Sequence, residues 1–178
     1  MPYASDSAGS ADRADVTLTP ASPAYGWIAR WERLDPALLA LRLPRPEPIS
    51  GVGISEARRD LDYLLIDAYH LKDFLKVDAV ATGVSRNRVE NQINTSPALA
   101  LLADACNLLK HGSLTTTRSG SAPTFGSPSG TSIGMAKGTW RLDQPISHQG
   151  RKLDGIQVAS NAVEAWRTAL QDWGLIPI

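Results

Sequence analysis

The sequence predicts a mainly α-helical protein, a bundle of helices with a small antiparallel β-hairpin before the last helix. Three observations predict this fold class. Segment 96–112 carries the start, body and stop signals of a helix, segment 55–77 has apolar positions at helical spacing on two faces, and segment 160–173 is amphipathic. Within segment 131–158 the apolar residues instead recur with period two, as they do in strands.

Length and composition predict one globular domain. The chain has 178 residues, of which 43% are hydrophobic, and this is enough to build a single core. Residues 1–23 are rich in Ala, Ser, Asp and Pro and lack apolar periodicity, so we expect a flexible tail. Residues 24–178 then form a single helical-bundle domain, with a loop at 112–130 and a hairpin at 131–158.

Net charge and cysteine content indicate the expected partners and cellular location of the protein. The net charge is zero and the pI is about 6.8, so nothing global requires nucleic acid or a membrane as partner. Residues 110–152 nevertheless contain six basic and one acidic side chain, which would steer an anionic ligand there, although scattered solvated charges also explain the excess. A single cysteine, no signal-peptide pattern and no apolar run of about 20 residues predict a cytoplasmic protein without a membrane partner.

The first helical segments form an arm that packs onto the core. Residues 24–34 are expected to form a short helix whose Trp27 and Trp31 face inward, and residues 36–43 add a turn or two after Pro36. Three prolines between 44 and 48 then predict an extended connection.

Segment 55–77 is expected to be the longest helix, capped by Ser55. Two apolar faces would sandwich it between neighbours at the centre of the bundle. The first face contains Leu61, Leu64, Leu65, Ala68, Leu71 and Leu75, and the second contains Tyr63, Ile66, His70 and Phe74.

A short helix over 85–93, capped by Ser85, leads into the most completely specified helix. Ser96 is its expected N-cap, Pro97 suits the first position, and Gly112 suits the left-handed residue that ends it. Most of this helix is apolar, and Cys106 lies on its main apolar stripe as a core thiol. The remaining narrow strip carries Asp104, Asn107 and His111.

The last third begins with a polar loop, 112–130, which is long enough to be either disordered or functional. Residues 139–142 and 155–158 are expected to pair as strands, joined by a connection that contains His148. We interpret His148 as an exposed turn residue rather than a catalytic one. The closing helix is expected from about Ser160 to Trp173, with Gly174 ending it.

The polar strip at 104–111 is where chemistry would start. A histidine held in a partly buried groove can act as general acid or base, and an asparagine one turn away can orient it or a phosphate. The alternative is a structural network in which Asn107 and His111 bond to the backbone or to Asp67. Asp104 and His111 are about 10 Å apart along a helix, too far to hold one ion, so no metal or other cofactor is expected.

The pairing of segments 67–73 (DAYHLKD) and 104–111 (DACNLLKH) resembles the HEPN superfamily. Members of this superfamily are helical bundles, and many are metal-independent ribonucleases. Their motif has an arginine, often followed by asparagine, and then a histidine about one turn on. Asn107 and His111 match the asparagine and the histidine, whereas Cys106 stands at the arginine position and cannot supply a guanidinium group.

The resemblance implies a protein that binds or cleaves RNA, as a homodimer, in a defence or toxin–antitoxin setting. It implies His111 as general acid/base, Asn107 as a positioning group, and Asp104 or His70 as the group that orients His111. Lys110 and Lys72 would bind the substrate. The alternative is a non-catalytic protein-interaction module with an unknown partner, for which His111 should be buried and hydrogen-bonded rather than open to solvent.

Overall fold

The computed structural model describes residues 26–46, 49–133 and 138–178, and within them the chain is mainly helical, as predicted. The expected tail at 1–23 lies outside the described residues. In chain order the elements are α1 (Trp27–Arg42), α2 (Gly51–Val77), α3 (Ala79–Thr82), α4 (Arg86–Thr95), α5 (Pro97–His111), β1 (Thr124–Phe125), β2 (Ser129–Ser132), β3 (Trp140–Asp143), β4 (Pro145–His148), β5 (Arg151–Asp154) and α6 (Gly155–Asp172).

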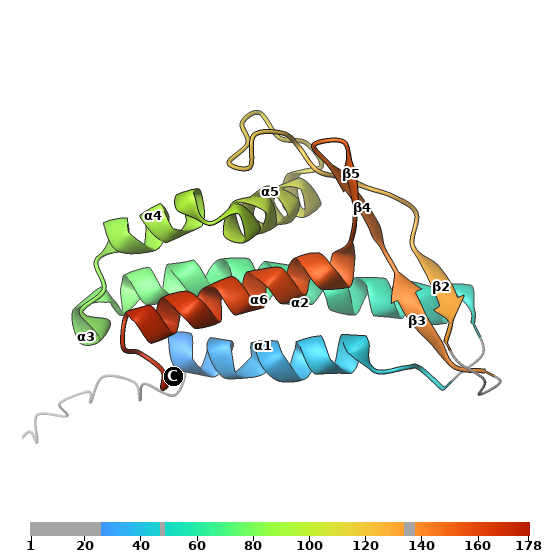
Figure 1. Cartoon of the computed structure of the whole chain (residues 1–178), viewed down its shortest axis with the longest axis horizontal. Coiled ribbons are helices and arrows are strands. Elements are labelled where there is room, and N and C mark those ends of the chain that lie inside the picture. Colours follow the sequence, from blue (N-terminus) through green and yellow to red (C-terminus); the bar gives the residue numbers. More distant parts are fainter. Residues whose placement is uncertain (1–25, 47–48, 134–137) are drawn as a thin grey trace, which may run out of the picture.

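Helix α2 is the centre of the bundle. It packs against α1, α4, α5 and α6, and the strands lie at one end of the long helices (Figure 1). All six residues of its first apolar face are buried, which confirms that part of the prediction. The second face is not enclosed, because Tyr63 is 62% exposed, so the expectation of a helix sandwiched on both sides was wrong there.

Two helix boundaries differ from the sequence prediction. Helix α2 begins at Gly51, because the Ser50 side chain accepts a 3.1 Å hydrogen bond from the Gly53 backbone N–H, whereas Ser55 lies inside the helix. Helix α1 runs without a break from Trp27 to Arg42 with Pro36 inside it, so the two expected segments are one helix. Trp27 and Trp31 are buried, as predicted.

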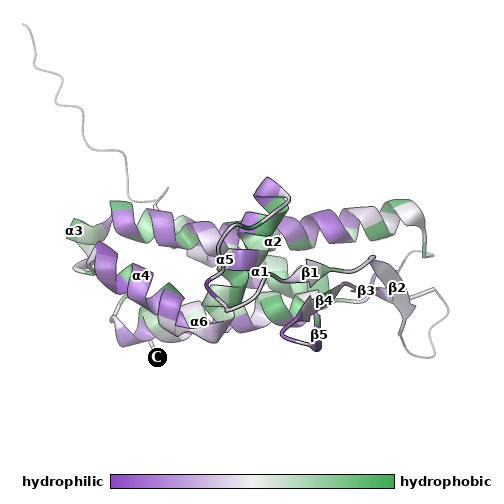
Figure 2. Cartoon of the chain, turned by 90° about the horizontal axis from the view of Figure 1, so that it is seen from above, coloured by the Kyte–Doolittle hydropathy of each residue, from purple (hydrophilic) through white to green (hydrophobic). Residues whose placement is uncertain are grey.

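Helices α4 and α5 begin and end nearly where the sequence predicted. Ser85 caps α4, and Ser96 caps α5 by accepting from the Leu99 N–H. Pro97 is the first helical residue of α5, and Gly112 ends the helix with φ of 70°. Seen from above, α5 crosses α2 steeply, and its hydrophilic end extends past α2 (Figure 2).

The strands form a small antiparallel region before α6, as expected, although in a different arrangement. One sheet has the order β1-β4-β5, and a second sheet pairs β2 with β3. The segment 155–158, predicted as a strand, is the first turn of α6, because the Asp154 side chain accepts from the Ile156 N–H and starts the helix there. No helix in the described part of the chain is long and apolar enough to cross a membrane.

Candidate functional site

Asp104 anchors the loop that follows α5. Its side chain is only 1% exposed, and its two oxygens accept hydrogen bonds from the backbone N–H groups of Arg118 and Ser119 at 2.8–3.0 Å. The Ser119 hydroxyl donates a further bond of 2.6 Å to the same carboxylate. These hydrogen bonds occupy the Asp104 carboxylate. Asp104 therefore bonds to the loop and not to His111, which was its expected partner.

The last turn of α5 is open by comparison. His111 is exposed and Asn107 is half-buried. Within the described residues, neither side chain forms a hydrogen bond. Asp67, the alternative partner considered for them, instead pairs with Arg30 and Arg33 of α1. The buried network expected for a purely structural role of Asn107 and His111 is therefore absent from the described part of the chain.

A compact group of ionisable side chains joins α2 to the end of α5. We call His70, Lys72 and Asp73 of α2 together with Lys110 of α5 the α2–α5 cluster. The Asp73 carboxylate lies 2.8 Å from His70 Nδ1 and 2.6 Å from Lys72 Nζ, and the Lys110 ammonium contacts His70 Nε2. The structure thus brings together three of the residues predicted from the sequence, and adds Asp73.

The contacts of His70 define its tautomer. A carboxylate only accepts hydrogen bonds and an ammonium only donates them, so the imidazole donates from Nδ1 to Asp73 and accepts at Nε2 from Lys110. Burial opposes the ionisation of Asp73, but the hydrogen bonds from Lys72 and His70 outweigh it and lower its pKa. An ionised Asp73 holds the ring with its basic nitrogen toward α5, which is the orientation that a general base requires.

Cys106 faces the core, as predicted. The residue is fully buried, and burial raises the pKa of its thiol to about 11. The residue that the HEPN resemblance would align with arginine therefore lies inside the bundle. Any cation near the end of α5 must come from another residue, and Lys110 and Lys72 are the ones in the cluster.

Sequence reasoning missed a second polar site on the other side of Asp104. His148 is half-buried at the end of β4, not an exposed turn residue, and its Nε2 lies 2.9 Å from the Ser119 hydroxyl. The next residue, Gln149, has a positive φ of 50° and donates from Nε2 to the Ser119 carbonyl. The excess of basic residues at 110–152 was the only signal of this site in the sequence.

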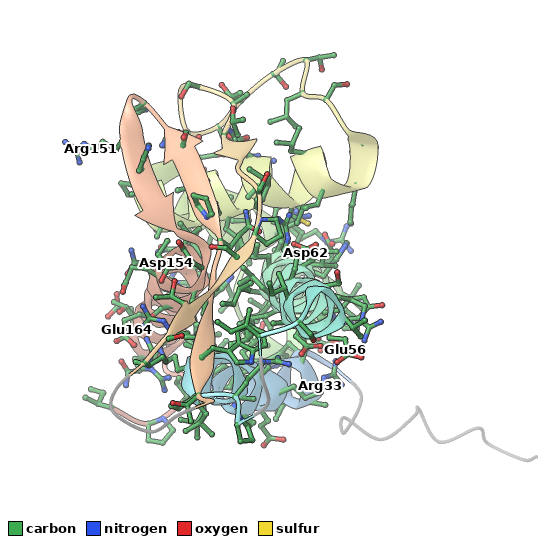
Figure 3. All side chains as sticks on the ribbon, turned by 90° about the vertical axis from the view of Figure 1, so that its right-hand side faces the viewer. Arg33, Glu56, Asp62, Arg151, Asp154 and Glu164 are labelled. Carbon is green, nitrogen blue, oxygen red and sulfur yellow. The ribbon has the colours of Figure 1, made fainter. Side chains whose placement is uncertain are left out.

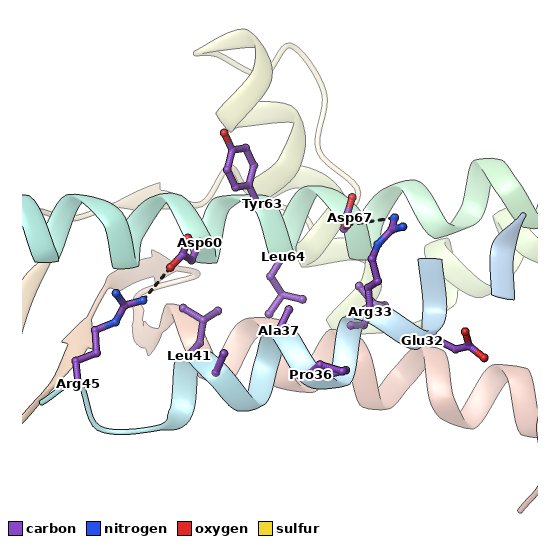
Figure 4. Close-up of a pocket in the computed structure, with 12 residues that line it drawn as sticks. Glu32, Arg33, Pro36, Ala37, Leu41, Arg45, Asp60, Tyr63, Leu64 and Asp67 are labelled. Atoms are coloured by element: carbon purple, nitrogen blue, oxygen red, sulfur yellow. Dashed lines mark hydrogen bonds and ion pairs between the residues drawn. The ribbon is translucent and has the colours of Figure 1, made fainter. Parts of the chain in front are cut away.

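A groove lies between α1 and α2 (Figure 4). It has a volume of about 470 Å³ and apolar walls that include Ala37, Leu41 and Leu64. An ion pair lies at each end, Arg45 with Asp60 and Arg33 with Asp67 (Figure 4). The exposed Tyr63 stands at its edge.

Within the described ranges, no three His, Cys, Asp or Glu side chains are grouped so that they could hold a metal ion. The chain matches no protein-family model, no curated protein and no solved structure.

Proposed function

We propose that this protein is a HEPN-like RNA-binding protein that cleaves RNA at the α2–α5 cluster without a metal ion. The observation that carries the proposal is the arrangement of His70, which Asp73 orients and Lys110 contacts, beside a last turn of α5 that leaves His111 open to solvent. Transphosphorylation of RNA is accelerated by a general base, a general acid and positive charge near the phosphoryl oxygens, and two histidines and a lysine can supply these.

The proposed reaction uses the ribose 2′-hydroxyl as nucleophile. When a backbone phosphate binds, its oxygens draw the Lys110 ammonium away from His70, and the freed Nε2 accepts the 2′-hydroxyl proton. The 2′-oxygen forms a bond to phosphorus while the bond to the 5′-oxygen breaks, and the protonated His111 imidazole gives its proton to that leaving oxygen. Lys110 and Lys72 balance the charge that develops on the phosphoryl oxygens.

These roles differ from those expected by resemblance alone. His70 takes the role of base, with Asp73 rather than Asp104 as the orienting carboxylate, because Asp104 is bound to the loop. Asn107 lies one turn before His111, where its amide can bond a phosphate oxygen. Lys110 supplies the positive charge, because the Cys106 thiol has no cationic form and lies in the core.

The test is cleavage of a mixed RNA pool by the purified protein in the presence of a chelator. We expect wild type to cleave, and His70→Asn and His111→Ala each to reduce the rate at least about 100-fold, the usual share of one acid–base group. Lys110→Ala should reduce the rate too, whereas Lys152→Ala, which removes the same charge from β5, should not. Circular dichroism confirms folding of each variant, and an inactive wild type would contradict the proposal.

The second candidate is the non-catalytic interaction module, and the α1–α2 groove favours it. An apolar groove with an exposed tyrosine at its edge is typical of a protein contact. The partner of such a module is unknown, and a second copy of the chain is the first one to test. Sedimentation of wild type and Tyr63→Ser tests this candidate. A dimer that Tyr63→Ser dissociates, together with an absence of RNA cleavage, would favour it over the nuclease.

A further inference from the structure

A second open groove is lined by no residue of the α2–α5 cluster, and we name it the Arg118–Arg151 groove. It lies between the junction of α4 and α5, the anchored loop, the β4–β5 hairpin and α6. Its volume is about 780 Å³, within the range of roughly 300–1,000 Å³ usual for small-molecule sites. It is lined by Asn94, Thr95, Ser96, Pro97, Ala98, Ala100, Leu101, Arg118, Ser119, His148, Gln149, Arg151, Leu153 and Asn161.

The ionisable side chains that line this groove are all basic. Two arginines and a histidine line it, and none of the described residues that line it is an aspartate or a glutamate. Three carboxylates adjoin the lining residues and are already bonded. Asp104 accepts from the backbone of Arg118 and from Ser119, and Glu90 pairs with Arg118 from α4. Asp154 caps α6 beside a smaller neighbouring cavity. A ligand in this groove would therefore meet positive charge without direct competition from acidic lining residues.

The Arg118 guanidinium group is held by hydrogen bonds, but some of its N–H donors are unpaired within the described residues. Its Nη1 donates to Glu90 at 3.0 Å and to Asn94 at 2.7 Å, while Nη2 and Nε have no partner within the described residues. Its backbone is fixed as well, because its N–H donates to Asp104. A guanidinium group that is positioned by one edge and open on the other suits a phosphate.

The β4–β5 pairing adds the second arginine. His148 lies opposite Arg151 in the antiparallel register, so their side chains share a face of the hairpin. Arg151 projects from the hairpin into solvent (Figure 3) and forms no ion pair with a described residue. His148 is fixed by Ser119, whose hydroxyl donates to Asp104 and so accepts from His148 Nε2.

The rest of the groove suits an organic group rather than a bare anion. Ala98, Leu101 and Leu153 give it apolar surface. The amide oxygens of Asn94 and Asn161 already accept from Arg118 and Gln157, and Gln149 Nε2 donates to Ser119, so the NH₂ groups of the two asparagines and the Gln149 oxygen are the donors and the acceptor left for the edge of a nucleobase. We propose that the Arg118–Arg151 groove binds the phosphate monoester of a nucleotide, either a free nucleotide or the 5′-phosphorylated end of an RNA. This site is separate from the α2–α5 cluster, and the inference does not depend on cleavage there.

Calorimetric titration with AMP, adenosine and a tetraribonucleotide with or without a 5′-phosphate tests the proposal. We expect saturable binding of AMP or of the 5′-phosphorylated tetraribonucleotide, and binding at least about tenfold weaker when the same molecule lacks its phosphate. If AMP binds, a free nucleotide is sufficient. If only the phosphorylated tetraribonucleotide binds, the ligand is an RNA end.

The variant Arg151→Gln assigns the binding to this groove. It should weaken binding by about tenfold, because it removes one charged donor from an exposed position. The matched control is Lys152→Gln, which removes the same charge from the next residue of β5, on the opposite face of the strand, and should change affinity by less than about twofold. Absence of binding by every phosphate monoester, equal binding of adenosine and AMP, or equal losses in the two variants would overturn the proposal.

Discussion

The two ends of the polar strip on α5 have opposite environments. Asp104 is buried, and three donor groups of the following loop occupy its carboxylate, whereas His111, two turns later, is exposed and has no hydrogen bond within the described residues. The buried residues of α5 end at Cys106, and the hydrophilic end of the helix extends past α2 (Figure 2). The comparison shows that one helical face can serve structure at one position and remain open for chemistry two turns away.

The largest expected effect is at the buried end. Asp104→Ala would leave two backbone N–H groups and one hydroxyl without their acceptor, so we expect a loss of about 3 kcal/mol in the free energy of unfolding. Urea denaturation measures this loss. Asp172→Ala, which removes an exposed carboxylate at the end of α6, should stay within about 0.5 kcal/mol of wild type. Equal effects of the two substitutions would mean that the Asp104 carboxylate contributes no more to stability than an exposed one.

The Cys106 thiol offers a pH-dependent test of the same buried region. Its pKa is about 11 in the folded protein against an ordinary value of 9.0, so between these values the unfolded chain binds fewer protons than the folded one. Stability should therefore be fully present below pH 9 and fall as pH rises toward 11, by at most about 1.4 kcal/mol per pH unit. Unfolding of wild type and Cys106→Ala at several pH values isolates this contribution. Parallel pH profiles of the two proteins would contradict burial of the thiol.

Ser119→Ala removes only one of the hydrogen bonds by which Asp104 holds the loop, whereas Asp104→Ala removes all of them. The hydroxyl is one of several donors to the carboxylate, and the backbone N–H groups remain, so we expect a cost of about 1 kcal/mol. A double-mutant cycle with Asp104→Ala should show that the two changes are not additive. Additive losses would mean that Ser119 acts on stability independently of Asp104.

The smallest effect on stability is expected at the open end. His111→Ala and Asn107→Ala should each change the free energy of unfolding by less than about 0.5 kcal/mol, because neither side chain bonds to the described part of the protein. The same urea measurements apply. A loss above 1 kcal/mol for His111→Ala would make this residue part of the scaffold.

Local signals explain why α5 could be predicted from the sequence and α2 only in part. The cap, the proline and the terminal glycine of α5 lie within the helix segment itself. The start of α2 was misplaced by four residues because Gly51 and Gly53 are poor helix formers. Gly53 has a tertiary reason to be in the helix, since a Cβ atom there would lie 3.1 Å from the Trp140 ring. The sequence around Gly53 does not indicate its contact with Trp140, which is distant in the chain.

Only those parts of the candidate site whose residues lie on one helix could be predicted from the sequence. The spacing of 104, 107 and 111 placed these residues on one strip, and DAYHLKD placed His70 three residues before Asp73. The partners of Asp104 come from a loop 14 and 15 residues later, where no periodicity exists. His148 contacts Ser119 across a longer separation of 29 residues. The division of the strip into an anchor and an open end therefore needed the fold.

The claim that RNA binds at the open end of α5 is tested most directly by an NMR titration of isotope-labelled protein with a short RNA. The RNA carries 2′-O-methyl groups, which block the proposed nucleophile, and it lacks a 5′-phosphate. If RNA binds at the end of α5 and at the α2–α5 cluster, backbone amides at 70–73 and 107–112 should shift, and those at 99–104 should stay unchanged. Shifts confined to residues outside the end of α5 and its α2 neighbours, or no shifts at millimolar RNA, would contradict it.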